Sequence, residues 1–126
     1  MNVVDSSGWI EYFRDAPNAA VFEPVVGDSN SVVVPTIAIL EVVRHLRRWA
    51  GEEAADEAAA QMRTGLVVSL DAELAVKAAT VSLRHKLPLA DSIVLATAQA
   101  FEATLWTQDA DFQHLPGVTY VPKKAE

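Results

Sequence analysis

Short apolar runs alternate along the chain with longer stretches whose apolar residues recur at helical spacing. The short runs predict strands over residues 3–4, 31–34, 66–70, 104–107 and 117–121. The longer stretches predict a helix that follows Ser6 or Ser7 and runs through Phe13, one that follows Thr36 and ends near Gly51, and helices over 52–63, 72–86 and 89–102. A short or irregular helix that contains Pro24 is expected after Asn18. Because strands and helices alternate, the pattern predicts an α/β fold with a mainly parallel central sheet and helices on both faces.

Capping residues mark the expected helix boundaries. Ser6 or Ser7 is expected to cap the first helix, Thr36 the helix that follows the second strand, and Asp71 the helix before position 86. Gly65 is expected to end the Ala- and Glu-rich helix. No repeat or linker interrupts the pattern, so we expect one domain over 1–126, with a polar tail over 123–126.

Composition narrows the class of protein. The chain has 126 residues, of which 51% are hydrophobic, and this fraction is too high for a disordered protein. The absence of cysteine excludes a disulfide scaffold, a thiolate nucleophile and a cysteine-ligated zinc site. No uncharged stretch is long enough to cross a bilayer, and the first residues do not resemble a signal peptide. The expected location is therefore the cytoplasm.

Acidic residues occupy the positions where a parallel sheet binds ligands, beyond the carboxyl ends of its strands. Asp5 ends the first strand, and Asp109 and Asp111 follow the strand over 104–107. Glu41 interrupts the apolar run IAILEVV, where an unpaired carboxylate is costly to bury. Asp91 lies between apolar residues in LPLADSIVLATA.

Each acid taken alone has a plain structural explanation. Asp5, Asp109 and Asp111 fit turns or helix caps, Asp91 fits the first turn of a helix, and Glu41 fits the polar edge of an amphipathic helix. One shared explanation is simpler, because carboxylates that converge on one point bind hard divalent cations such as Mg²⁺ and Mn²⁺.

Other catalytic motifs are missing from the sequence. It has no phosphate-binding loop, no Gly-x-Gly-x-x-Gly and no Gly-x-Ser-x-Gly. The three histidines, His45, His85 and His114, are scattered along the chain. A zinc site or a Ser-His-Asp triad therefore has little support.

Four segments in order, VVDSSGWIEYF, PTIAILEVVRHLRR, LPLADSIVLATA and LWTQDADF, resemble the PIN-domain family, in particular the VapC-type toxins of toxin–antitoxin pairs. The resemblance implies a metal-dependent ribonuclease. It assigns the catalytic and metal-binding roles to Asp5, Glu41, Asp91 and Asp109, with Asp111 as a further ligand or just behind the ligands. In such a site a bound divalent ion lowers the pKa of a water molecule that attacks the phosphodiester.

The resemblance also implies contacts and partners. Ser7 and Thr107 are candidates to donate hydroxyl contacts to water on the metal or to phosphate. Arg44 lies one helical turn beyond Glu41 and is a candidate to hold RNA. The implied partners are an antitoxin of the VapB kind that blocks the site and a second copy of the chain.

Two alternatives and the net charge bear on this interpretation. A phosphoaccepting receiver domain has similar length, but no lysine follows the strand over 104–107. A catalytically inert PIN-like binding module is favoured only if the acids are lost. The net charge of −7 argues against a phosphate-rich partner if the acids are spread evenly. It does not do so if four or five of them bind metal ions in one pocket.

Overall fold

A five-stranded sheet forms the middle of the structure, a computed structural model that describes residues 1–125. The elements, in chain order, are β1 (Asn2–Val4), α1 (Ser6–Phe13), α2 (Ala19–Val26), β2 (Val32–Pro35), α3 (Thr36–Ala50), α4 (Glu52–Met62), β3 (Leu66–Val68), α5 (Ala72–His85), α6 (Leu89–Ala100), β4 (Thr104–Thr107), the short 3₁₀ helix η1 (Ala110–Phe112) and β5 (Val118–Tyr120). The strand order is β3-β2-β1-β4-β5, and all four pairings are parallel.

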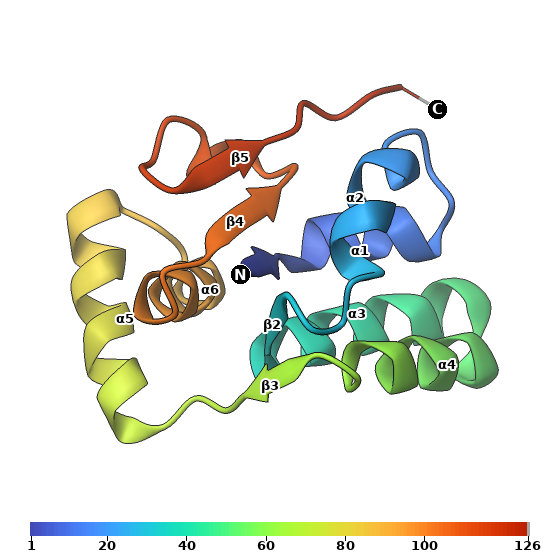
Figure 1. Ribbon diagram of the computed structural model, residues 1–126, viewed down its shortest axis with the longest axis horizontal. Coiled ribbons are helices and arrows are strands. Elements are labelled where there is room, and N and C mark those ends of the chain that lie inside the picture. The colour runs from blue at the N-terminus through green and yellow to red at the C-terminus, as the bar shows by residue number, and fades with distance from the viewer. Residues whose placement is uncertain (126) are drawn as a thin grey trace.

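Helices cover both faces of the sheet, as the sequence predicts. Successive side chains of a strand point to opposite faces. Val3 and Val33 therefore pack with α5 and α6, whereas Val4, Val32 and Val34 pack with the helices from α1 to α4. Figure 1 shows this separation, with α5 and α6 on the left of the strands and the other four helices on the right. Strands that are apolar on both faces are typical of a parallel sheet covered twice.

The chain reverses its direction across the sheet at β1. It runs outward from β1 through β2 to β3, and then returns through α5 and α6 to β4 on the other side of β1 (Figure 1). In open parallel sheets such a reversal opens a crevice at the carboxyl ends of the two central strands. Here those ends are Asp5, after β1, and Thr107, at the end of β4.

The first helix is capped one residue earlier than expected. Asp5, not Ser6 or Ser7, is the N-cap of α1, and its side chain accepts a hydrogen bond from the backbone N of Gly8. Thr36 is likewise wrong as a cap, because it is the first residue of α3. Polar residues near a predicted helix start thus located the boundary only to within a residue or two.

Other boundaries agree closely with the sequence pattern. Asp71 caps α5 as predicted, and its side chain accepts from the backbone N of Leu74. Strand β3 ends at Val68 rather than at position 70, and α6 ends at Ala100 rather than at position 102. Within the described residues 1–125, none of the helices combines the length and the hydropathy that a membrane span requires.

Close packing at Gly8 joins the core to the first acid. A Cβ atom added at Gly8 would lie 2.6 Å from Cγ1 of Val4 and 2.8 Å from the Phe22 ring, both fully buried. Glycine is therefore required where α1 crosses the end of β1, and its N–H holds the Asp5 carboxylate.

We predict that Gly8→Ala destabilises the fold by about 1–3 kcal/mol, because the added methyl group overpacks the core. Urea unfolding measures this change. Since Val4 is the nearest neighbour, the cost of Gly8→Ala should be smaller in a Val4→Ala background, giving a favourable coupling energy in the double-mutant cycle. Additive effects of the two substitutions would contradict the contact.

Candidate active site

The Asp5 carboxylate is buried between the ends of β1 and β4, and only 4% of the residue is exposed. Its Oδ1 accepts hydrogen bonds from Ser7 Oγ at 2.6 Å and from the Gly8 backbone N at 3.1 Å. Its Oδ2 accepts from Thr107 Oγ1 at 2.6 Å. Both oxygens are thus held by donors from two separate segments, which fixes the orientation of the carboxylate.

Thr107 connects Asp5 to the acids after β4. Its Oγ1 also accepts from the backbone N of Asp109 at 2.9 Å. Asp109 is the N-cap of η1, where its Oδ1 accepts from the backbone N of Asp111 at 2.9 Å. The cap expected for Asp109 is therefore present, and the same turn brings two carboxylates to the end of β4.

Three carboxylates come together at this edge of the sheet. Asp91, Asp109 and Asp111 each offer an oxygen, and these atoms lie within 4.8 Å of one another. Asp91 stands in the first turn of α6 and is half-buried, whereas Asp111 is exposed. Carboxylate oxygens at this spacing are the donor set that hard divalent cations prefer, so the residues fit such an ion.

Burial and the neighbouring acids raise the pKa of Asp91. The pKa of Asp91 rises from 3.8 to about 7, first because burial disfavours its charged form. The further causes, in decreasing order, are the negative charges of Asp109, Asp5, Asp111 and Glu41. A cation bound among these groups would relieve both the repulsion and the burial penalty.

The pKa of Asp5 rises less than that of Asp91. Burial raises it from 3.8 to about 6, and the charge of Asp109 adds to the rise. The hydrogen bonds from Ser7, Thr107 and the Gly8 backbone oppose it, because they stabilise the carboxylate.

Glu41 approaches the acids from α3 but stands outside the group of three. It is half-buried, and its charge is the weakest of the four that raise the pKa of Asp91. It also lines a cleft of about 630 Å³ together with Arg44. The expected tetrad is therefore arranged unevenly. Asp91 and Asp109 lie together with Asp111, Asp5 is joined to Asp109 through Thr107, and Glu41 lies at the edge of the cleft.

Two hydroxyl groups expected to contact phosphate or water on the metal have protein partners in the structure. Ser7 and Thr107 both donate to the Asp5 carboxylate, so these hydrogens do not point to a phosphate or a water. A hydroxyl beside a buried carboxylate is its nearest available donor. Arg44 is exposed in the cleft that Glu41 lines, where it is free to meet a substrate.

A buried polar network next to Asp5 escaped the sequence reasoning. Gln108 donates its backbone N to Ser7 Oγ at 3.1 Å and its Nε2 to Glu11 Oε1 at 3.1 Å. Asn18 donates Nδ2 to Gln108 Oε1 at 2.6 Å and its backbone N to Glu11 Oε2 at 2.8 Å. The network ties α1 to the end of β4. In the sequence, only the position of Gln108 between Thr107 and Asp109 points to this network.

The fold is that of an α/β protein, with parallel strands and helices on both faces of the sheet. The carboxylates at one sheet edge form an acidic site that fits a metal ion. The sequence profile of the PIN domain family matches residues 3–118, and the chain belongs to this family. The resemblance noted in the sequence is thereby confirmed. No curated protein matches the chain in sequence.

Several solved structures share the fold. A toxin–antitoxin complex from Klebsiella pneumoniae superposes with a TM-score of 0.79 at 23% identity, covering 94% of this chain and 96% of that one. The toxin VapC20 from Mycobacterium tuberculosis, described as cleaving the sarcin–ricin loop, gives 0.73 at 20% identity, with 89% and 92% covered. DNA-bound VapBC from Salmonella typhimurium gives 0.74 at 11% identity, with 95% and 96% covered.

We predict that Asp91→Asn stabilises the metal-free protein at about pH 8. The pKa of Asp91 is raised in the folded state, so the folded protein binds more protons than the unfolded chain between pH 3.8 and about 7, and stability falls as the pH rises through this window. Asparagine does not titrate and avoids this loss. Because Asp91 is half-exposed, we expect about 1–2 kcal/mol after solvent screening.

Urea unfolding in EDTA at about pH 8 and about pH 4 measures this difference, which should disappear at the lower pH. Asp71→Asn is the matched control, because asparagine also caps helices and Asp71 lies outside the acid cluster. A variant at position 91 that is less stable than the parent at pH 8 would contradict the repulsion described here.

Proposed function

We propose that this protein is a Mg²⁺- or Mn²⁺-dependent endoribonuclease that acts as the toxin of a VapBC-type pair. The observation that carries the proposal is the meeting of Asp91, Asp109 and Asp111 next to the buried Asp5. The family and the solved neighbours support it, since these include a toxin described as cleaving the sarcin–ricin loop.

The site residues have distinct roles in this proposal. Asp91 and Asp109 would hold the ion, with Asp5 and Glu41 completing the tetrad and Asp111 beside it. When bound, the ion supplies Lewis-acid polarisation of the phosphodiester and of the attacking water. A cation bound there would favour the ionised form of Asp91, whose pKa burial and the neighbouring carboxylates raise to about 7.

The surroundings of Asp5 keep the site in order. Ser7 and Thr107 direct both of its oxygens, and Gln108 holds Ser7 through its backbone N. Arg44, in the cleft beside Glu41, binds a phosphate of the RNA. In this proposal a histidine base is not required, because a bound ion would supply the polarisation of the water and the carboxylates would hold that ion.

We predict that the purified protein cleaves RNA in Mg²⁺ or Mn²⁺ and loses this activity in EDTA. Asp91→Asn and Asp109→Asn should each lower the cleavage rate by about 100-fold or more, because each removes a charged ligand of the ion that would polarise the phosphodiester. Gel analysis of a labelled RNA measures the rate. Asp71→Asn, at a helix cap outside the acid cluster, should keep it.

The same assay separates this function from the inert binding module. A folded parent protein that binds Mn²⁺ and RNA but cleaves none would favour the binding module. Cleavage that persists undiminished in EDTA would contradict the metal requirement.

Two protein partners complete the proposal, an antitoxin of the VapB kind and a second copy of the chain. Solved neighbours that are toxin–antitoxin complexes support the first. For the second, α5 presents apolar side chains to solvent, with Val76 70% and Leu83 83% exposed. Exposed apolar side chains grouped on one helix are typical of an interface.

We predict that Leu83→Arg converts the dimer into a monomer, because the charge would be buried unpaired in the interface. Light scattering after gel filtration measures the mass. Val21→Arg on α2, also an exposed apolar position, should leave the dimer intact. A parent protein that is monomeric at high concentration would contradict the proposed dimer.

A further inference from the structure

A cleft runs along one face of α3, with Glu41 at one end and Trp49 at the other. Its volume is about 630 Å³, and α3 lines it with Glu41, Arg44, His45, Arg48 and Trp49. These positions are three or four residues apart, so they share one face of the helix. From Glu41 to Trp49 the helix rises by about 12 Å, at 1.5 Å per residue.

Basic side chains that form no ion pair among residues 1–125 line this cleft and its margin. Arg14 and Lys123 border an adjoining cleft of about 280 Å³ that also contains His45. In the part of the chain that the structure describes, the ion pairs are Arg47–Asp56 and Lys77–Glu73. The cleft cations therefore have no carboxylate partner there, in a chain whose net charge is −7.

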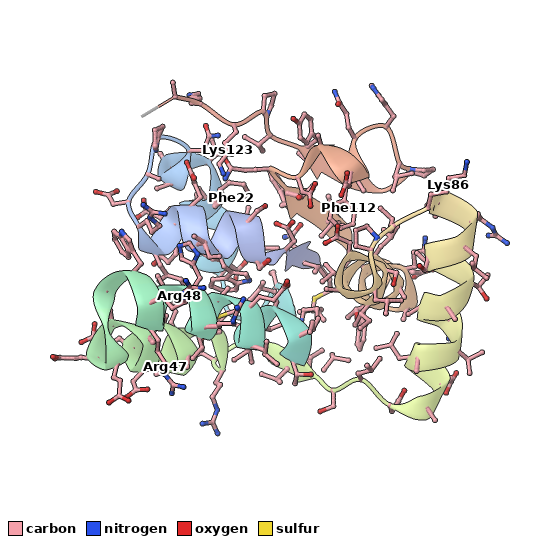
Figure 2. All side chains as sticks on the ribbon, turned by 180° about the vertical axis from the view of Figure 1, so that it is seen from behind. Phe22, Arg47, Arg48, Lys86, Phe112 and Lys123 are labelled. Atoms are coloured by element: carbon pink, nitrogen blue, oxygen red, sulfur yellow. The ribbon has the colours of Figure 1, made fainter. Side chains whose placement is uncertain are left out.

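The charges at the cleft also act on His45. Its pKa is lowered first by burial and then by the neighbouring charges of Arg14, Arg48 and Lys123. Figure 2 labels Arg48 on α3 and Lys123 near the C-terminus, on opposite sides of α1 in that view, and Arg47 nearer to α4. Arg47 and Arg48 are thus adjacent in sequence, but Arg48 lies in the cleft and Arg47 lies beside α4.

An aromatic platform stands at the far end of the cleft. The guanidinium carbon of Arg14 lies 4.6 Å from the centre of the Trp49 ring, and Arg14 Nη1 lies 3.4 Å from His45 Nε2. Arginine only donates, so Nε2 of His45 is the acceptor. Trp49 is 51% exposed, which leaves ring surface open to a further planar group.

We propose that this cleft is the path of a single RNA strand, with phosphates on Arg44 and Arg48 and a base stacked on the Trp49–Arg14 platform. The inference rests on the proposed nuclease function and adds to it the residues that hold the strand beyond Glu41. Glu41 places the scissile phosphate at the acid end of the path. A basic groove joined to an aromatic stacking surface is how proteins bind single strands.

The dimensions and chemistry of the cleft favour an unpaired strand. About 12 Å of helix spans about three or four phosphates at the axial spacing of a stacked strand. The platform offers a flat ring to a base, which is accessible only when the base is unpaired. An acidic peptide would use the arginines but has no planar base for Trp49.

Binding of a fluorescein-labelled eight-nucleotide single-stranded RNA tests the path, measured by anisotropy in EDTA over a series of salt concentrations. For Arg44→Ala/Arg48→Ala we expect the slope of log K against log salt to fall by about 1.4, since each lost phosphate contact removes about 0.7. Trp49→Ala should lower affinity about tenfold with an unchanged slope, and Trp49→Phe should restore most of it. Arg47→Ala is the matched control and should behave like the parent.

Two results would overturn the path: an unchanged slope in the double arginine variant, or a blunt duplex of the same RNA that binds as tightly as the single strand. If binding of a synthetic acidic peptide depends on Trp49 and binding of RNA does not, the cleft is a protein-binding site instead.

Cleavage assays test the RNA path separately from the proposed nuclease activity. If the parent protein binds RNA as expected but never cleaves it, the nuclease proposal is contradicted and the RNA path stands. If the parent cleaves RNA and the variants have the same KM as the parent, the nuclease proposal stands and the RNA path is contradicted.

Discussion

The buried contact between Asp5 and Thr107 is the constraint on which the rest of the site depends. A carboxylate with 4% exposure is destabilising unless donors surround it, and Asp5 has three. Its donors come from the start of α1 and from the end of β4, so the carboxylate is satisfied only when these two segments meet. Thr107 then accepts from the Asp109 backbone and sets the next acid in place. The order of the site therefore follows from satisfying one buried charge.

The structural roles of the acids at helix starts also explain why these acids lie close together. Asp5 does cap α1, Asp109 does cap η1, and Asp91 does lie in the first turn of α6. In a parallel sheet, helices begin where strands end, so residues that begin helices collect at one edge. Capping is thus the means by which the fold delivers carboxylates to a common point. At that point burial, and after it the charges of the neighbouring carboxylates, raise the pKa of Asp91.

The sequence predicted the alternating elements, the parallel sheet and the acids, because hydrophobic periodicity and position after a strand are local properties. It did not predict that Ser7 and Thr107 serve Asp5, since this depends on β1 pairing with β4 across about a hundred residues of chain. The network of Gln108, Glu11 and Asn18 escaped for the same reason, as each of its members looks like an ordinary surface residue in sequence. Spacing along the chain also did not reveal that Glu41 stands apart from the other acids.

The net charge of −7 does not give the charge of any one surface of the protein, because charges act over only about 8 Å at physiological ionic strength. Helix α3 shows why. It carries Glu41 toward the acids in its second turn, and Arg44 and Arg48 follow along the same cleft. A phosphate chain approaching the site would meet the arginines of α3 first and the carboxylates only where a cation neutralises them. Local arrangement, and not the total, decides whether an acidic protein can hold RNA.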